Sequence, residues 1–216
     1  MRGWRTPMAC SRPRSSRREF LKVAAGLSAL VAGATAAEGA QAQPLRPTPS
    51  CPGAAPPTSR QTEGPYFKPD SPLRASLLEP GMAGTKIVVT GMVLSTSCQP
   101  VARALIDVWH ADDRGGYDNA GFRLRGHQFT DDQGRYRLET IVPGVYVGRT
   151  RHFHVKVQAP NRPGLTTQLY FPGDAANARD PIFSPELLMQ VKDATDAKAA
   201  TFDFVLDLGG GRAGRG

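Results

Sequence analysis

The chain has 216 residues, of which 27 are Lys or Arg and 19 are Asp or Glu, giving a formal net charge of +8 at pH 7. Residues 1–42 hold seven of the basic and two of the acidic residues, so the rest of the chain carries 20 basic and 17 acidic residues, or about +3. That remainder has no basic stripe interleaved with aromatic residues, which argues against a nucleic-acid-binding protein. Its length suits one domain with an adequate core.

Residues 1–42 have the features of an export signal. Two adjacent arginines, Arg17 and Arg18, precede Phe20, and a modest Ala-rich apolar stretch follows from Val23 to Ala37. A twin arginine before an apolar run is typical of a Tat-type bacterial signal, so we expect recognition by the Tat export machinery and a periplasmic or extracellular location. The alternative is a membrane anchor. The apolar run is shorter than the ~20 strongly apolar residues that a span needs, and we therefore expect cleavage, near residues 40–42 or 34–36, and no stable membrane anchor.

Residues 43–61 are rich in Pro, Ser, Thr and Ala, which predicts an extended arm. The arm contains Cys51, and Cys98 lies in a predicted turn. Cys10 would be lost with the signal, which leaves two cysteines in an oxidising compartment. A Cys51–Cys98 disulfide is then the default expectation, and two free thiols are the alternative.

The expected domain, residues 62–208, consists of short apolar or β-branched segments separated by turn residues. We predict strands at 86–94, 104–111, 135–141, 151–158, 165–171 and 201–208. This pattern indicates an all-β fold, an antiparallel β-sandwich, with one or two short helices. The clearest helix candidate is 185–192, which has Pro185 at its start. The Gly- and Arg-rich tail, 209–216, has nothing to bury and is expected to be disordered.

The segment from Arg151 to Val157 alternates between polar and apolar residues, which predicts a strand. Side chains on a strand alternate between its two faces. His152 and His154 therefore share one face, while the apolar residues between and after them face the core. A strand arranged in this way can offer two imidazoles to one ion.

Two tyrosines accompany this His-x-His motif. Tyr146 lies six residues before His152, and Tyr117 follows two glycines. Neutral imidazole is a common metal ligand, and phenolate is a hard anionic oxygen that suits a hard, highly charged cation. Two Tyr and two His would form a site with two negative charges, which fits ferric iron. The alternative is an ordinary solvated strand face near two structural aromatic residues.

Several further motifs surround these residues between Thr62 and Phe171. They are Thr62-Glu63-Gly64-Pro65-Tyr66-Phe67, Val108-Trp109-His110-Ala111, Gly116-Tyr117, Gly134-Arg135-Tyr136, Tyr146, His152-Phe153-His154 and Thr167-Gln168-Leu169-Tyr170-Phe171. In these motifs the chain resembles the intradiol ring-cleavage dioxygenases, the family of the catechol and protocatechuate dioxygenases.

The resemblance implies roles for individual residues. The four ligands of a non-haem Fe(III) ion would be Tyr117, Tyr146, His152 and His154. Arg149 and Gln168 match the family's pair beside the substrate, where the guanidinium would stabilise negative charge that develops on the ring; Arg151 competes for that role. Tyr146 would leave the metal and help to take up a proton. Tyr66 either lines the substrate pocket or anchors the core.

The resemblance also implies the reaction. A small aromatic diol of the catechol type would react with O2, both oxygen atoms would be incorporated, and the product would be a cis,cis-muconate-type diacid. The loop from Tyr146 to His152 is shorter than in the protocatechuate enzymes, which leaves the identity of the catechol open. A homo-oligomer is compatible with the sequence.

Two other classes of protein remain as alternatives. A non-catalytic, transthyretin-like β-sandwich binding module would share the architecture, since fold does not imply function, and it would bind no iron. A secreted copper or zinc protein would use the His-x-His motif with His110 or His127, and it would keep its metal in a Tyr146→Phe variant. Neither class accounts for the joint spacing of the Tyr, Arg, His and Gln residues. We expect structural roles for His110 and His127, and a hydrogen-bonded turn for the Asp residues around Tyr117.

Overall fold

The computed structural model describes residues 55–146 and 148–209. The predicted export signal, Cys51 and most of the Gly- and Arg-rich tail lie outside these residues. The predictions for those segments, including the Cys51–Cys98 disulfide, therefore stay predictions. Within the part of the chain that the structure describes, no helix is long and apolar enough to cross a membrane.

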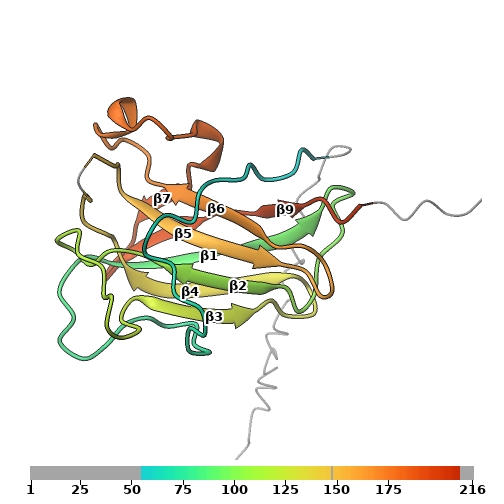
Figure 1. Cartoon of the computed structure of the whole chain (residues 1–216), viewed down its shortest axis with the longest axis horizontal. Coiled ribbons are helices and arrows are strands. Elements are labelled where there is room, and N and C mark those ends of the chain that lie inside the picture. Colours follow the sequence, from blue (N-terminus) through green and yellow to red (C-terminus); the bar gives the residue numbers. More distant parts are fainter. Residues whose placement is uncertain (1–54, 147, 210–216) are drawn as a thin grey trace, which may run out of the picture. The chain divides into compact units, whose positions relative to one another are not determined.

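Two β-sheets form the fold, which confirms the predicted β-sandwich (Figure 1). The larger sheet has the order β4 (Arg135–Ile141), β1 (Lys86–Ser95), β8 (Lys198–Thr201), β7 (Gln190–Asp193), and β9 (Phe204–Leu206) also pairs with β1. The smaller sheet has the order β3 (Arg125–Phe129), β2 (Leu105–Trp109), β5 (His152–Gln158), β6 (Leu165–Tyr170). Neighbouring strands are antiparallel except where β1 runs parallel to β8 and β9.

An apolar core fills the space between the sheets. From β1 and β5 it contains Ile87, Val89, Val93, Phe153, Val155 and Val157. The alternation in β5 therefore places its apolar residues in the core, as the sequence predicts, and leaves His152 and His154 on the opposite face of the sheet.

The helix predicted at 185–192 is wrong. Two short 3-10 helices are present, Asn177–Arg179 and Pro185–Leu187, and the chain is extended at Leu188 and in Gln190–Asp193. A single helical turn gains too few hydrogen bonds to offset the cost of nucleation, whereas Gln190–Asp193 gains a full ladder by pairing with β8 as β7. Tertiary pairing therefore overrides the local helical pattern.

The strand predicted at 201–208 is shorter in the structure, where β8 ends at Thr201 and β9 spans Phe204–Leu206. Between β8 and β9, Phe202 N donates to Thr90 O at 3.1 Å. The Phe202 carbonyl lies so close to Gly91 that a Cβ there would be 1.8 Å from the oxygen, so only glycine fits. The Tyr136 hydroxyl donates to the same carbonyl at 2.8 Å. The chain steps sideways at this point and continues along β1 as β9.

The segment before β1 covers the outer face of the smaller sheet (Figure 1). Gln61 N donates to Thr166 O of β6 at 2.9 Å, and Thr58 N donates to Val205 O of β9 at 2.9 Å. Further along, Leu73 forms a β-bridge with His127 of β3. Between the contacts of Gln61 and Leu73, Gly64 approaches His154 and Phe67 lies 4.9 Å from Trp109, ring centroid to ring centroid, so this segment covers the face that carries the two histidines.

Candidate metal centre

One row of side chains crosses the smaller sheet. Trp109 of β2 lies opposite Arg125 of β3 and opposite His154 of β5, and His154 in turn lies opposite Gln168 of β6. Directly opposite residues share a face of a sheet. The register therefore gathers an arginine, an indole, an imidazole and a carboxamide on the face away from the core, with His152 one step along β5.

The two histidines are buried and face each other. Their Nε2 atoms are 3.1 Å apart, and the rings are 4% and 3% exposed. Nδ1 of His152 donates to Thr150 O at 2.7 Å, so its Nε2 carries a lone pair in the neutral ring. Burial lowers the pKa of His152 to about 4 and that of His154 to about 2. Two neutral rings with adjacent nitrogens are suited to share one cation.

Trp109 and Gly64 fix the position of the His154 ring. The indole stacks on the imidazole with centroids 5.0 Å apart and an angle of 4° between the planes. From the other segment, Gly64 adopts φ of +70°, and a Cβ there would lie 3.1 Å from Cε1 of His154. Glycine at this position meets both demands, a left-handed conformation and a close approach to the ring.

The two predicted tyrosines lie beside the histidines. The Tyr117 ring is 6.3 Å from the His154 ring and 6.0 Å from the Tyr146 ring, centroid to centroid. Burial raises the pKa of Tyr117 above its ordinary value. Tyr66 stacks on Tyr117 at 4.4 Å, and its hydroxyl lies 2.9 Å from the Tyr146 hydroxyl. Tyr66 therefore lies in the cluster itself instead of in the core.

The loops that carry Tyr117 and Tyr146 are locked together through their backbones. The Asp112 carbonyl accepts hydrogen bonds from Gly115 N at 3.1 Å and from Gly144 N at 2.7 Å. A Cβ on Gly144 would lie 2.4 Å from Gly115 N, and a Cβ on Gly115 would lie 2.3 Å from Val145 O. This contact sets how far apart the two tyrosines can lie.

Asp112 and Asp118 form hydrogen-bonded turns, as the sequence analysis expected. The Asp112 carboxylate accepts from Gly116 N, and the Asp118 carboxylate accepts from Gly121 N and Arg123 N. The lowered pKa of Asp118 follows first from its Gly121 and Arg123 hydrogen bonds. The hydrogen bonds to these two carboxylates stabilise the conformation of the loop around Tyr117.

Arg149 contacts Gln168. Its Nη2 donates to Gln168 Oε1 at 2.6 Å, and its Nε pairs with Asp180 Oδ2 at 2.8 Å. Gln168 Nε2 donates to Thr62 O at 2.9 Å, and the Tyr170 hydroxyl donates to Gln168 Oε1 at 3.0 Å. Arginine and glutamine are thus oriented by several partners at once.

Asp180 was not found by the sequence analysis, although it is central to this arrangement. Burial acts to raise its pKa, but hydrogen bonds from the backbone N–H groups of Thr150 and Ile182 and the contact with Arg149 outweigh this, so the net pKa is lowered. It lies 31 residues after Arg149, in a loop with no motif around it. The position of Tyr170, by contrast, could have been predicted from the sequence, because Tyr170 is two residues after Gln168 and therefore shares its face of β6.

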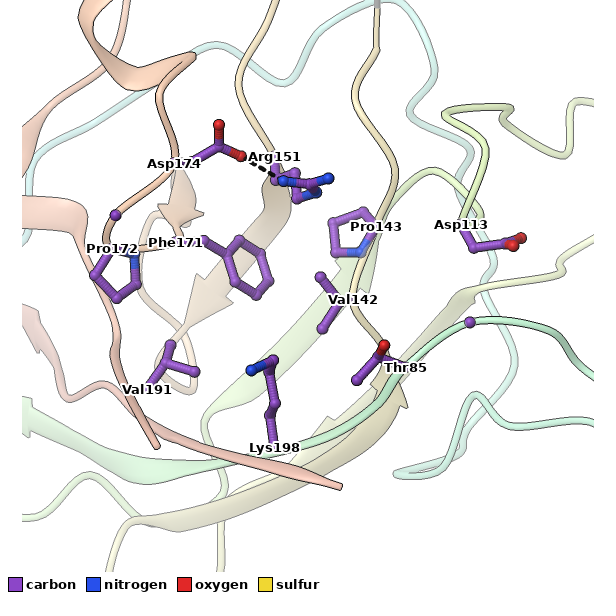
Figure 2. A pocket seen from close by; sticks show the side chains of 12 residues that line it. Thr85, Asp113, Val142, Pro143, Arg151, Phe171, Pro172, Asp174, Val191 and Lys198 are labelled. Carbon is purple, nitrogen blue, oxygen red and sulfur yellow. Dashed lines mark hydrogen bonds and ion pairs between the residues drawn. The ribbon is translucent and has the colours of Figure 1, made fainter. Parts of the chain in front are cut away.

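Arg151 lies outside this cluster, in a surface pocket. Figure 2 shows it directed toward Asp174, with which it pairs at 2.9 Å, in a surface pocket that Phe171 and Lys198 also line. Arg149 and Arg151 are thus separated, and Arg149 alone of the two contacts Gln168.

His110 and His127 have structural partners. Nδ1 of His110 donates to Ala111 O at 2.7 Å, so Nε2 accepts from the Thr140 hydroxyl at 2.7 Å. Burial lowers the pKa of His110 to about 4. Nδ1 of His127 donates to Ser71 O at 2.7 Å.

The residues present fit a hard trivalent cation. In the described parts of the chain, no group of three or more His, Cys, Asp or Glu side chains is placed to hold a metal ion. The candidate ligands here are instead two imidazoles with low proton affinity and two phenols, which a bound cation can deprotonate.

Comparison with known proteins gives a consistent result. A family model described as "Dioxygenase" matches residues 62–208. The protocatechuate 3,4-dioxygenase beta chain of Burkholderia cepacia is 38% identical over 118 residues, which are 46% of this chain and 50% of that one. The chlorocatechol 1,2-dioxygenase of Pseudomonas sp. (strain P51) is 29% identical over 172 residues, or 67% and 68% of the two chains.

A solved structure is more similar in sequence. It is the dioxygenase domain of a dioxygenase carbohydrate-binding protein fusion from the cellulolytic bacterium Streptomyces sp. SirexAA-E. It is 55% identical with a TM-score of 0.69, over 70% of this chain and 99% of that chain. The chain spans about half the length of several of the curated relatives that it matches.

Proposed function

This chain belongs to the intradiol ring-cleavage dioxygenase family, and from that premise we propose that it is a non-haem Fe(III) oxidoreductase that cleaves a catechol-type diol with O2 to a cis,cis-muconate-type diacid. One observation carries the proposal. Two tyrosines and two mutually facing, neutral histidines converge beside an arginine that is held by Gln168 and Asp180.

Tyr117, Tyr146, His152 and His154 would hold the ferric ion. When bound, iron would supply a Lewis-acidic centre that makes a chelated catecholate reactive toward O2. The histidines can serve as ligands across neutral pH because burial keeps their pKa values at about 4 and about 2. The Thr150 carbonyl orients the His152 ring, as outer partners of metal-bound imidazoles commonly do.

Tyr146 and Tyr66 are placed to handle a proton. Their hydroxyl oxygens are 2.9 Å apart, so Tyr66 can donate a hydrogen bond to Tyr146 as a phenolate and accept one after Tyr146 takes up a proton from the substrate. The Tyr66–Tyr146 hydrogen bond is also the first cause of the raised pKa of Tyr66, which keeps Tyr66 protonated and able to donate. These contacts support a role for Tyr66 beside the substrate.

Arg149 would stabilise negative charge on the substrate ring. A fixed cation in a partly buried site acts on developing charge without having to reorganise. Asp180 and Gln168 supply that fixation, because they hold Nε and Nη2 of the guanidinium.

We also propose export for this protein. The support is the twin arginine and the Ala-rich stretch in residues 1–42. The Tat route carries folded proteins, which suits a metal centre assembled in the cytoplasm. A Cys51–Cys98 disulfide would form after export, and the assembly state is compatible with a homo-oligomer.

The visible spectrum of the purified protein tests the enzymatic proposal. We expect a red to burgundy tyrosinate-to-iron charge-transfer band that shifts when catechol is added without oxygen. Admission of air should then yield a muconate product. A protein that stays colourless after ferric loading would refute the iron site and leave a non-catalytic binding module as the better hypothesis. A protein that holds copper or zinc as isolated, and keeps that metal in a Tyr146→Phe variant, would instead favour the copper or zinc alternative.

A further inference from the structure

Arg125 is a buried cation that the proposed reaction does not use. Arg125 is the first residue of β3 and is 2% exposed. It lies opposite Trp109, which in turn lies opposite His154. None of the ion pairs within residues 55–146 and 148–209 includes it. Burial of a charge costs several kcal/mol unless its surroundings compensate, so this position calls for an explanation.

All of its hydrogen bonds go to backbone carbonyls. Nε and Nη2 donate to Asp118 O at 3.2 and 3.0 Å, and Nη1 donates to Tyr66 O at 2.6 Å. Asp118 directly follows Tyr117, and the Tyr66 ring stacks on the Tyr117 ring at 4.4 Å with 15° between the planes. One guanidinium therefore joins the two segments whose rings stack. Its planar fork can do this with three donors at fixed angles.

The charge has a second consequence. The carboxylates of Asp118 and Asp107 act electrostatically on Arg125, and both are already engaged, by backbone N–H groups and by the Ser71 hydroxyl respectively. A phenolate at Tyr117 would add a negative charge beside Arg125. At the short range and low dielectric of a buried site, such an interaction is much stronger than at the surface.

From this geometry we infer that Arg125 is a positioning residue for the iron site: through Asp118 O and Tyr66 O it holds Tyr117 and Tyr66 in their stacked arrangement, and it brings a fixed positive charge to the segment that carries Tyr117. The inference rests on the proposed function, because it concerns Tyr117 as a ligand.

The energy of the charge-transfer band can separate this role from a merely structural one. The transition moves an electron from phenolate to iron, and a cation beside the phenolate stabilises that electron. In full-length Arg125→Gln, which lacks the charge, we expect the band at longer wavelength and ferric affinity lower by about 10- to 100-fold. In Arg125→Lys, which keeps the charge but lacks the fork, we expect a band near the wild-type position with weakened ferric affinity.

Arg123→Gln is the matched control, because it removes the same charge from an exposed side chain two residues away. It should change neither band position nor affinity.

The inference is overturned if Arg125→Gln keeps both the wild-type band and the wild-type affinity, or if Arg123→Gln shifts the band equally. If Arg125→Gln does not fold, Arg125→Lys decides, since wild-type ferric affinity in that variant contradicts the positioning role. A wild-type protein without any band would refute the proposed function as well, whereas a coloured Arg125→Gln variant with an unmoved band and wild-type ferric affinity refutes only this inference.

Discussion

Arg149 and Arg151 lie two positions apart in the chain but have different surroundings. Arg149 is held by Asp180 and Gln168, while Arg151 pairs with Asp174 in the surface pocket of Figure 2. Asp180 is almost fully buried, so its contact with Arg149 is shielded from solvent, whereas the Arg151 side chain is 42% exposed. This difference makes the two arginines a matched pair for testing which one acts on the substrate.

We predict that Arg149→Lys lowers kcat by about 10²- to 10³-fold, which is typical for loss of a fixed charge-stabilising donor. Lysine keeps the charge but cannot contact Gln168 and Asp180 together through a planar fork. The iron band should remain, because Arg149 is not a ligand. Arg151→Lys should keep near-wild-type activity. Steady-state kinetics on both variants, with iron content measured, provides the test, and an equal loss in the two variants would contradict the assignment.

At the scale of elements, the two tyrosine-bearing loops depend on two glycines. Gly144 and Gly115 allow the backbones to meet at the Asp112 carbonyl, which accepts from both. We predict that Gly144→Ala lowers stability by about 1–3 kcal/mol, as overpacking usually does, because its Cβ would lie 2.4 Å from Gly115 N. Separation of the loops should also reduce the intensity of the iron band at a fixed ferric concentration.

Gly164→Ala serves as the control for this variant. A Cβ at Gly164 would meet its nearest atoms at 3.9 Å, which is ordinary contact. We expect a stability change within about 0.5 kcal/mol and an unchanged spectrum. Denaturant unfolding of both variants and ferric titration provide the measurements. Equal iron binding by Gly144→Ala and the wild type would show that the loop contact does not position the tyrosines.

The elements that could be predicted are those whose pattern is local. The alternation in β5 gives both its strand character and the shared face of His152 and His154. β3 was missed because Arg125–Phe129 mixes charged, polar and glycine residues, and its pairing with β2 supplies what the pattern lacks. The residues of β7 were assigned to a helix for the same reason, because the backbone hydrogen bonds that stabilise β7 come from its pairing with β8 and not from its own sequence. Edge strands of this kind depend on partners that the local sequence does not reveal.

At the scale of the whole molecule, the site is assembled by register. Trp109, Arg125, His154 and Gln168 come from four strands and meet only because each lies opposite the next. The sequence identified His154 and Gln168 through the family resemblance, but it could not place Arg125 or the stacked Trp109 beside them. Asp180 was missed on the same grounds, because its approach to Arg149 depends on how the loop after β6 folds back.

The burial of three histidines also predicts how the stability of the fold depends on pH. Burial lowers the pKa of His110 from 6.5 to about 4, and it acts in the same direction on His152 and His154. Between pH 6.5 and 4 the unfolded chain therefore binds protons that the native state excludes. The contribution of these histidines to the free energy of unfolding is fully present above pH 6.5 and is lost as the pH falls. For His110 the loss is about 3 kcal/mol at most.

Thermal unfolding of the metal-free protein at pH 7, 5.5 and 4.5 tests this expectation, since Tm should fall steadily across the series. His110→Gln removes one titrating ring and keeps a polar side chain that can contact Thr140. Its Tm should be lower than that of the wild type at pH 7 because the native hydrogen bonds are altered, but it should fall less between pH 7 and 4.5. Parallel curves for the two proteins would mean that His110 is protonated without resistance in the native state, and that its burial does not contribute to the acid sensitivity of the fold.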